Sequence, residues 1–285
     1  MISVASVATR RVEINGIEVA VSEAGAGGRP LLLVHGFTGH RDDFIDRIPA
    51  LAERGRVLAP DLRGHGGSSH TGRAETFGFE QLVDDQRALL DALGVDRCDL
   101  LGHSLGGMVT LRFALAYSER VASLILLNTA PFAPDAYDPA VFEKAGAIAL
   151  AKGMARLQEL VEQASRNAVD PSAADRRTEK WADRYWAHHR RRYREMDPAA
   201  YGPLGAAMLG QTSLVPRLAA IRCPTTVIVG SDDLKFLRGA DALAAAIPHA
   251  RRVTIPDAGH HPHVENPEAW LAAMREHLGS ASAAA

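Results

Sequence analysis

The sequence predicts an α/β protein, with a mostly parallel eight-stranded sheet, helices on both faces of the sheet and an inserted helical cap. Short apolar runs alternate with helical patterns along most of the 285 residues, and this alternation is typical of a parallel sheet covered on both sides. The N-terminal part instead alternates polar and apolar residues, as an antiparallel hairpin does. One long internal segment contains helical patterns only.

The expected strands begin with a hairpin over residues 11–24, where two alternating runs flank Asn15-Gly16, a favoured two-residue turn. Six further runs are apolar enough to be strands buried on both faces: residues 31–34, 56–59, 98–102, 122–128, 225–230 and 251–255. Helical patterns follow or separate them at residues 42–54, 79–93, 105–117, 236–247 and 264–278. The last seven residues, GSASAAA, predict a disordered tail.

The segment from Pro131 to Gly210 breaks the alternation, because it holds no strand-like run and is rich in Ala, Arg, Glu, Gln and Met. It is too long to be a simple loop of a compact domain. We therefore expect a helical cap over residues 131–212, inserted into an α/β core formed by residues 1–130 and 213–285.

Charge and targeting patterns exclude several classes of protein. Lys and Arg total 32 and Asp and Glu total 34, so no broad basic field is available for nucleic acid or an anionic membrane. The sequence has no run of eighteen apolar residues, so it predicts no membrane span. The N-terminus lacks the pattern of a secretory signal. Cys98 and Cys223 precede apolar runs and are expected to be reduced core thiols. These features predict a cytoplasmic protein, and the Ala- and Arg-rich composition suggests a high-GC bacterium.

Motifs for common cofactors and structural metals are missing from the sequence. There is no GxxxxGK[ST], GxGxxG, HExxH or CxxC pattern, so nucleotide-binding and structural-zinc interpretations have no support. We expect no cofactor and no metal. No pattern in the sequence sets the oligomeric state.

A nucleophile motif stands between one expected strand and one expected helix. Residues 102–106 read G-H-S-L-G, directly after the apolar run at 98–102 and before the helical pattern at 105–117. In a G-x-S-x-G elbow the serine occupies a sharp strand-to-helix turn, and the two glycines let the backbone make that turn. This context predicts that Ser104 is a nucleophile at the carboxyl edge of the sheet.

With this motif the chain resembles the α/β-hydrolase superfamily over about residues 1–130 and 213–285, and the resemblance implies the α/β-hydrolase fold. Residues 35–39, H-G-F-T-G, directly follow the first buried strand. The resemblance implies that the backbone N–H groups of Phe37 and Leu105 form an oxyanion hole, whose donors stabilise charge that develops on a carbonyl oxygen. His35 is then expected to form structural hydrogen bonds.

A serine hydroxyl needs a base, and the base needs a group that orients it. The order of the family, serine then acid then histidine, implies that Asp233 is the acid and His260 the base, with Asp232 as the alternative acid. His261 and His263 are expected to lie in the loop and at the next helix start. The three histidines resemble a metal site only superficially, since zinc ligands converge from several elements.

Three further features of the sequence stand out. Residues 61–68, D-L-R-G-H-G-G-S, resemble a family loop that braces the edge of the site. Trp181, Tyr185 and His188 share one helix face, which fits either cap packing or a pocket roof. The basic run at 188–194 fits a solvated face or, alternatively, a carboxylate-binding role.

The predicted function is hydrolysis of a carboxylic ester or related acyl bond of a small molecule through an acyl-enzyme. Thioesters, lactones and some C–C bonds are within reach of the same groups. A pyruvate-eliminating lyase is the second hypothesis, because several segments resemble the menaquinone-pathway synthase family: residues 35–39, 61–68, 206–214, 233–236 and 258–267. His103 and Met108 depart from that family, which has Tyr and a carboxylate-binding Arg there. A non-catalytic ligand sensor on the same fold is the third hypothesis.

Overall fold

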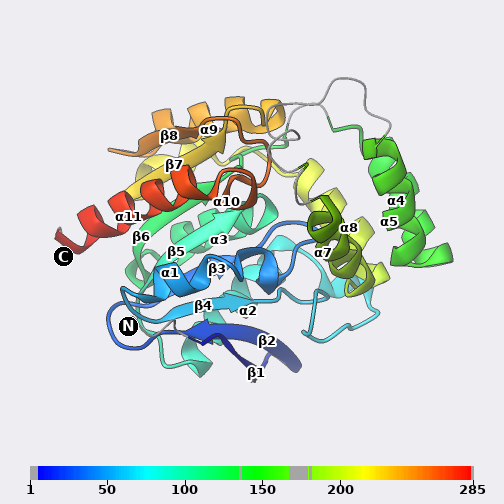
Figure 1. The fold of residues 1–285 in the computed structure, drawn as a ribbon, viewed down its shortest axis with the longest axis horizontal. Helices are drawn as coiled ribbons and strands as arrows, with labels where there is room; N and C mark the ends of the chain where they lie inside the picture. Colours follow the sequence, from blue (N-terminus) through cyan, green and yellow to red (C-terminus); the bar gives the residue numbers. More distant parts are fainter. Residues whose placement is uncertain (1–5, 135–136, 167–178, 180–181, 284–285) are drawn as a thin grey trace.

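The computed structural model describes residues 6–134, 137–166, 179 and 182–283. It contains an eight-stranded sheet in the order β1-β2-β4-β3-β5-β6-β7-β8 (Figure 1). The strands are β1 (Ala8–Ile14), β2 (Ile17–Ala24), β3 (Leu31–Val34), β4 (Val57–Pro60), β5 (Cys98–His103), β6 (Val121–Leu127), β7 (Thr225–Gly230) and β8 (Arg251–Ile255). β2 pairs antiparallel with β1 and β4, whereas the other neighbours pair parallel. The expected mostly parallel eight-stranded sheet is therefore confirmed.

The N-terminal hairpin forms around the predicted turn. Asn15 and Gly16 have φ values of 45° and 71°, which the favoured two-residue hairpin turn requires at both central positions. Ile14 pairs with Ile17 across the turn, so the register of both strands is set by these two residues.

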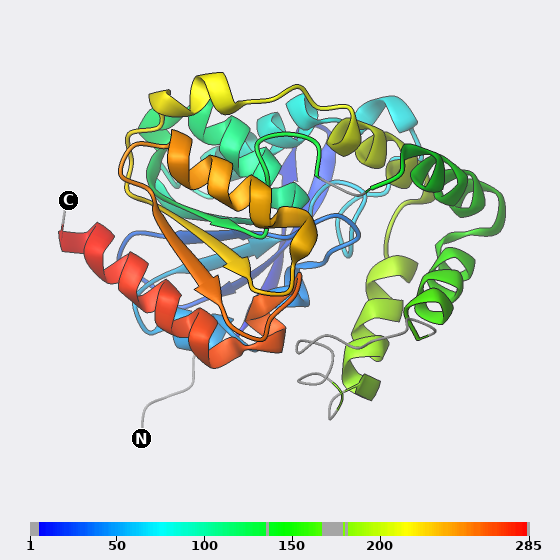
Figure 2. The same cartoon turned by 90° about the horizontal axis from the view of Figure 1, so that it is seen from above.

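Two hydrophobic cores lie on opposite faces of the sheet. Along β6, Leu124 and Leu126 belong to one core, and Ile125 and Leu127 to the other, because successive side chains of a strand point to opposite faces. The first core is covered by α2 (Phe79–Ala92), α3 (Leu105–Ala116) and α9 (Leu234–Ala246). The second is covered by α1 (Ile48–Ala52) and α11 (Pro267–Ala283), with Trp270 fully buried (Figures 1 and 2). Burial on both faces explains why these strands are apolar throughout.

The expected disordered tail is wrong for residues 279–283, which continue helix α11. Ala281 is buried, and its carbonyl oxygen accepts a hydrogen bond from Arg29 Nη2 at 3.2 Å. Alanine has the highest helix propensity, and the contact with Arg29 holds this last turn on the core. The final two residues lie outside the described part of the chain.

Four described helices follow β6 and precede β7: α4 (Pro139–Lys152), α5 (Met154–Arg166), α7 (Ala182–Arg194) and α8 (Pro198–Leu209). They lie together beside the sheet, on the right of Figure 1. α4 and α8 approach closely, since a Cβ on Gly146 would lie 3.2 Å from Gly202 Cα. The helical content of this segment agrees with expectation, and its separation as a cap stays a prediction.

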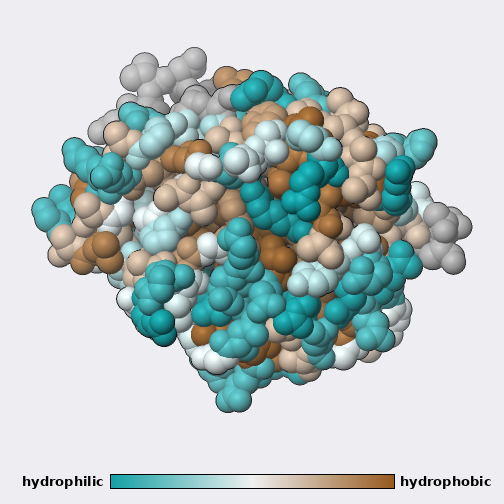
Figure 3. Space-filling model, turned by 180° about the vertical axis from the view of Figure 1, so that it is seen from behind, coloured by the Kyte–Doolittle hydropathy of each residue, from teal (hydrophilic) through white to brown (hydrophobic). Residues whose placement is uncertain are grey.

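The remaining elements are short connections and helices: η1 (Arg41–Phe44), η2 (Ala74–Thr76), η3 (Ser118–Arg120), η5 (Val215–Ala220) and α10 (Pro262–Glu265). The rear face mixes hydrophilic and hydrophobic residues (Figure 3). Within the described ranges, no helix is both long and apolar enough to cross a membrane.

Candidate active site

Ser104 occupies a strained turn between β5 and α3. Its φ of 52° and ψ of −118° lie outside the regions that L-residues favour, at a cost of about 1–3 kcal/mol. The backbone around it is fixed by two hydrogen bonds, from Ser104 N to Leu127 O (2.9 Å) and from Thr129 Oγ1 to Ser104 O (2.7 Å). This is the geometry that the G-x-S-x-G pattern predicts.

The two glycines of the motif are required by close packing rather than by positive φ. A Cβ on Gly102 would lie 2.5 Å from Gly106 O, and one on Gly106 would lie 2.3 Å from His35 O. Both distances are far shorter than a carbon–oxygen contact allows. Any side chain at either position would therefore displace the turn or the His35 loop.

His260 and Asp233 meet at the same edge of the sheet, beyond β8 and β7. His260 Nδ1 lies 2.7 Å from Asp233 Oδ2. Asp233 is buried, whereas the side chain of His260 is 28% exposed. Because a carboxylate only accepts hydrogen bonds, Nδ1 carries the proton and Nε2 is left as the acceptor. Asp232 instead accepts a hydrogen bond from Ser231 Oγ at 2.9 Å.

Asn128 was missed by the sequence reasoning, although it directly follows the buried strand β6. Its Nδ2 donates to Asp233 Oδ2 and to Gly259 O, the latter at 3.0 Å. The amide thus ties the carboxylate to the loop that carries His260. An asparagine at the end of a buried strand was the signal available in the sequence.

The loop at residues 35–39 lies against the Ser104 turn. A Cβ on Gly36 would lie 3.0 Å from Ser104 Cβ, so this glycine permits the close approach. Leu105 is the first residue of α3, and its N–H therefore has no intrahelical acceptor. Phe37 directly follows Gly36 in this loop, and its pairing with Leu105 as N–H donors stays a prediction.

His35 forms structural hydrogen bonds, as expected. Its Nδ1 donates to Gly36 O at 2.8 Å, and its Nε2 accepts from Leu62 N at 2.9 Å. Burial lowers the pKa of His35, which keeps the ring neutral and allows one donor and one acceptor. His35 therefore joins the 35–39 loop to the 61–68 loop.

The 61–68 loop is braced by a buried carboxylate. Asp61 accepts hydrogen bonds from Arg41 N (2.7 Å) and Gly67 N (2.8 Å), and it also pairs with the Arg41 guanidinium. Arg63 forms two 2.8 Å hydrogen bonds with Asp85 of α2. These contacts support the expected bracing role.

Glu265 and His103 hold the loop around His260. Glu265 Oε2 accepts hydrogen bonds from Gly259 N (2.6 Å) and His261 N (3.2 Å), on either side of His260 in the chain. His103 Nε2 donates to His260 O at 2.7 Å. Burial holds the pKa of His103 well below its usual range and raises the pKa of Glu265 to about 7. Neither role was predicted.

His261 and His263 lie at the N-cap and inside α10, as expected. Burial lowers the pKa of His263 to about 3 and that of His261 well below its usual range. Across the described part of the chain, no group of three or more His, Cys, Asp or Glu side chains is arranged to hold a metal ion.

Aromatic rings extend from His260 toward α4 and α8. Phe236 stacks on His260 with ring centroids 4.8 Å apart, and Tyr137 lies 6.4 Å from Phe236. Phe37 lies 4.8 Å from the ring of Tyr201 on α8. The surroundings of the site on this side are therefore mainly aromatic.

A cavity of about 970 Å³ lies between α7, α10 and the η1 region. We call it the α7 cavity. Ser104, Asp233 and His260 do not line it, whereas His261 does. Tyr185 and His188 also line it, which favours the pocket-wall interpretation of this helix face. Trp181 lies outside the described residues.

Comparison with known proteins identifies the family of this chain. A sequence model described as the alpha/beta hydrolase fold matches residues 29–267. Epoxide hydrolase A of Mycobacterium tuberculosis is 39% identical over 132 residues, which are 46% of this chain and 41% of that protein. The chain therefore matches less than half the length of this curated relative.

Solved structures match over nearly the whole chain. An enol-lactonase from Burkholderia xenovorans LB400 is 26% identical, with a TM-score of 0.82, and the match covers 95% of this chain and 100% of that one. A thermophilic esterase from Thermogutta terrifontis is 28% identical, with a TM-score of 0.81 and coverage of 96% and 99%.

Proposed function

The chain belongs to the α/β-hydrolase family, and from that premise we propose that it cleaves a carboxylic ester or related acyl bond through Ser104, His260 and Asp233. The observation that carries the proposal is the 2.7 Å contact between His260 Nδ1 and Asp233 Oδ2, at the sheet edge where Ser104 is strained. An acid that orients a histidine, at the sheet edge that also carries a serine in a strained turn, supports nucleophilic acyl transfer.

In the proposed reaction, His260 Nε2 takes the proton of Ser104 Oγ as the oxygen attacks the carbonyl carbon. The N–H groups of Phe37 and Leu105 stabilise the charge on the carbonyl oxygen, an effect worth about 10²–10³ in rate for each donor. His260 then protonates the leaving oxygen, and an acyl-Ser104 ester remains. Water, deprotonated by His260, attacks this ester and releases the acid. Asp233 keeps the proton on Nδ1 throughout.

Epoxide opening is a less suitable reaction for Ser104, although a relative is named an epoxide hydrolase. Attack of a serine oxygen on an epoxide carbon would form an alkyl ether. An ether has no carbonyl that water could attack, so the enzyme would not be regenerated. The esterase and enol-lactonase neighbours are named for cleavage of acyl bonds, which supports the proposal.

The lyase hypothesis gains no support from the position of Met108. This residue is fully buried, and Gln211 Nε2 contacts its Sδ at 3.1 Å. A thioether cannot replace a guanidinium in binding a carboxylate. The small-molecule acyl substrate, the cytoplasmic location and the absence of a cofactor stay predictions.

A fluorophosphonate probe and a series of p-nitrophenyl esters test the proposal. We expect one probe adduct at Ser104 by intact mass, steady ester turnover, and a loss in kcat of about 10⁴-fold or more in Ser104→Ala. Near-normal turnover of Ser104→Ala would remove this residue from the mechanism. Labelling without turnover would favour the lyase or the sensor.

A further inference from the structure

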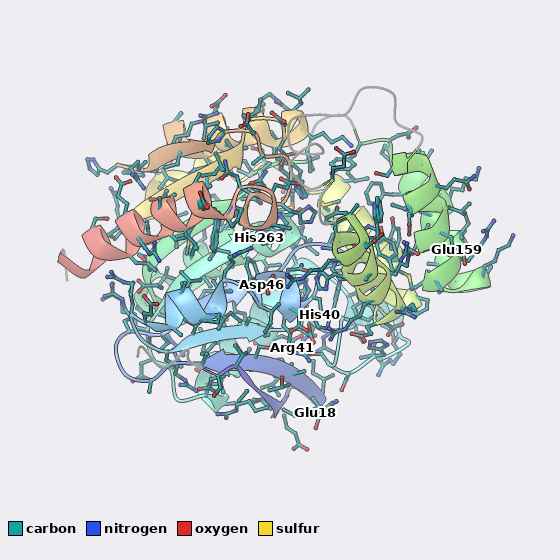
Figure 4. All side chains as sticks on the ribbon, in the orientation of Figure 1. Glu18, His40, Arg41, Asp46, Glu159 and His263 are labelled. Carbon is teal, nitrogen blue, oxygen red and sulfur yellow. The ribbon has the colours of Figure 1, made fainter. Side chains whose placement is uncertain are left out.

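The α7 cavity is lined by three arginines and five carboxylates, whereas an aromatic ring stacks on His260. Its volume of about 970 Å³ is at the upper end of the range for small-molecule sites. Asp46 and His263, labelled in Figure 4, both line it, and Tyr185 and Val264 add apolar surface. His261 lines the cavity and directly follows His260, so the cavity adjoins the proposed reaction centre.

Two guanidinium groups on the wall have N–H donors without an acceptor in the described part of the chain. The Arg192 side chain is 7% exposed, and within the same residues its Nη1 makes two long contacts, to Asp43 Oδ1 (3.4 Å) and His261 Nε2 (3.5 Å). Among the described residues, Arg192 Nε has no hydrogen-bond partner. Arg47 Nε donates to His263 O at 2.9 Å. Since each guanidinium carries five N–H donors, both groups can serve a further acceptor.

The carboxylates nearest to these cations are already engaged. Asp43 accepts hydrogen bonds from His188 Nε2 (2.7 Å) and His40 N (3.1 Å). Arg184 Nη2 contacts both oxygens of Asp46, at 2.5 and 2.6 Å. Asp42 is paired in the same way with Arg191 of α7 at 2.9 Å. Two more acids on the wall, Glu179 and Asp183, are exposed, and solvent therefore screens their charge.

From the unpartnered N–H donors of these two guanidinium groups we infer that the α7 cavity binds a carboxylate of the substrate, held by Arg192 and Arg47. The inference rests on the proposed acyl hydrolysis and narrows its substrate class to esters or lactones that carry a free carboxylate. A planar guanidinium matches the two oxygens of a carboxylate, and charge-assisted hydrogen bonds of this kind are stronger than neutral ones. The apolar wall at Tyr185 and Val264 would cover the connecting carbon atoms.

Matched substrate pairs test this inference. One pair is mono-p-nitrophenyl adipate and p-nitrophenyl hexanoate, with the carboxylate on the acyl side. The other is 4-carboxyphenyl hexanoate and phenyl hexanoate, with the carboxylate on the leaving group. We expect kcat/KM of the wild type to favour the carboxylate member of at least one pair about tenfold or more. Equal kcat/KM values within both pairs would overturn the inference and leave the hydrolase proposal intact.

Three variants test whether the preference for the carboxylate substrate arises in the cavity. Arg192→Gln and Arg47→Gln are expected to reduce the ratio of kcat/KM values within the preferred pair to near unity. Arg190→Gln is the matched control, because Arg190 lies on the same helix but pairs with Glu162 and does not line the cavity; it should retain the full preference. A preference that survives in Arg192→Gln and Arg47→Gln alike would refute the assignment. Because Arg192 is buried against Asp43, the folding of the Arg192→Gln variant is checked by circular dichroism. If Arg192→Gln does not fold, the carboxylate preference of Arg47→Gln alone decides the test.

A binding measurement separates this inference from the proposed function. Should none of the four esters be hydrolysed, the proposed function fails, and the thermal shift of the wild type with adipate then tests the cavity directly. Stabilisation by adipate but not by the neutral diamide adipamide, lost in Arg47→Gln and kept in Arg190→Gln, supports a carboxylate site. No stabilisation of the wild type by adipate overturns it.

Discussion

Replacing Glu265 with glutamine is expected to stabilise the protein at alkaline pH. Glu265 Oε2 accepts the N–H groups of Gly259 and His261 at 2.6 and 3.2 Å, and the Oε1 of a glutamine can occupy the same place. Burial, the largest cause, raises the pKa of this carboxyl to about 7. The substitution therefore keeps the acceptor and removes only the ability to ionise.

The sign of the effect follows from proton binding. The unfolded chain ionises Glu265 near its ordinary pKa of 4.5, whereas the folded protein retains the proton up to about pH 7. Between these values the folded state binds more protons, so the free energy of unfolding falls as pH rises. The pKa difference of about 2.5 corresponds to about 3 kcal/mol at about 1.4 kcal/mol for each pKa unit. Above about pH 7 the wild type has lost this part of its free energy of unfolding. Glu265→Gln has no such loss, because glutamine does not ionise.

Urea unfolding followed by circular dichroism measures this difference. We expect wild type and Glu265→Gln to have similar free energies of unfolding near pH 5, and the variant to be more stable by up to about 3 kcal/mol near pH 8. Glu268→Gln is the control, since Glu268 is exposed at the start of α11. A stability difference that stays constant from pH 5 to pH 8 would refute the reasoning.

Three further substitutions probe the site. Asp233→Asn is expected to lower kcat about 10⁴-fold, because it disturbs the tautomer of the base, whereas Asp232→Asn should change kcat less than tenfold; steady-state kinetics on one ester compares them, and the reverse order would exchange the two acids. Gly106→Ala should destabilise the fold by at least about 1–3 kcal/mol in urea unfolding, since its Cβ would lie 2.3 Å from His35 O; a stability equal to that of the wild type would show that the turn can relax.

Local patterns were sufficient for the sheet and for the serine turn. The apolar strands differ from the helical segments in period and length, so most strand bounds agree to within a residue or two. The glycines of the motif at residues 102–106 also have a geometric explanation. Gly102 and Gly106 approach the neighbouring backbone too closely for any side chain to fit. In both cases the information lies within a few residues of the chain.

The roles of residues whose partners are far away in the sequence could not be predicted in the same way. Asn128 and His103 are separated from their partners Asp233 and His260 by 105 and 157 residues. An asparagine or a histidine is ordinary in either position, and its importance depends on a neighbour that only folding selects. The helical end of α11 is a similar case, because Arg29, from the other end of the chain, binds its last turn.

The choice between Asp232 and Asp233 shows where spacing stops being informative. Both residues lie in the turn after β7, and the separation from His260 differs by a single position. The backbone gives the two residues different positions, because Asp233 is the N-cap residue of α9 and Asp232 N donates to Ala258 O at 2.8 Å. Adjacent side chains of such a turn point in different directions, and that of Asp233 reaches His260 Nδ1. Asn128 then binds the same Asp233 oxygen, so a second contact from β6 fixes the direction that spacing left open.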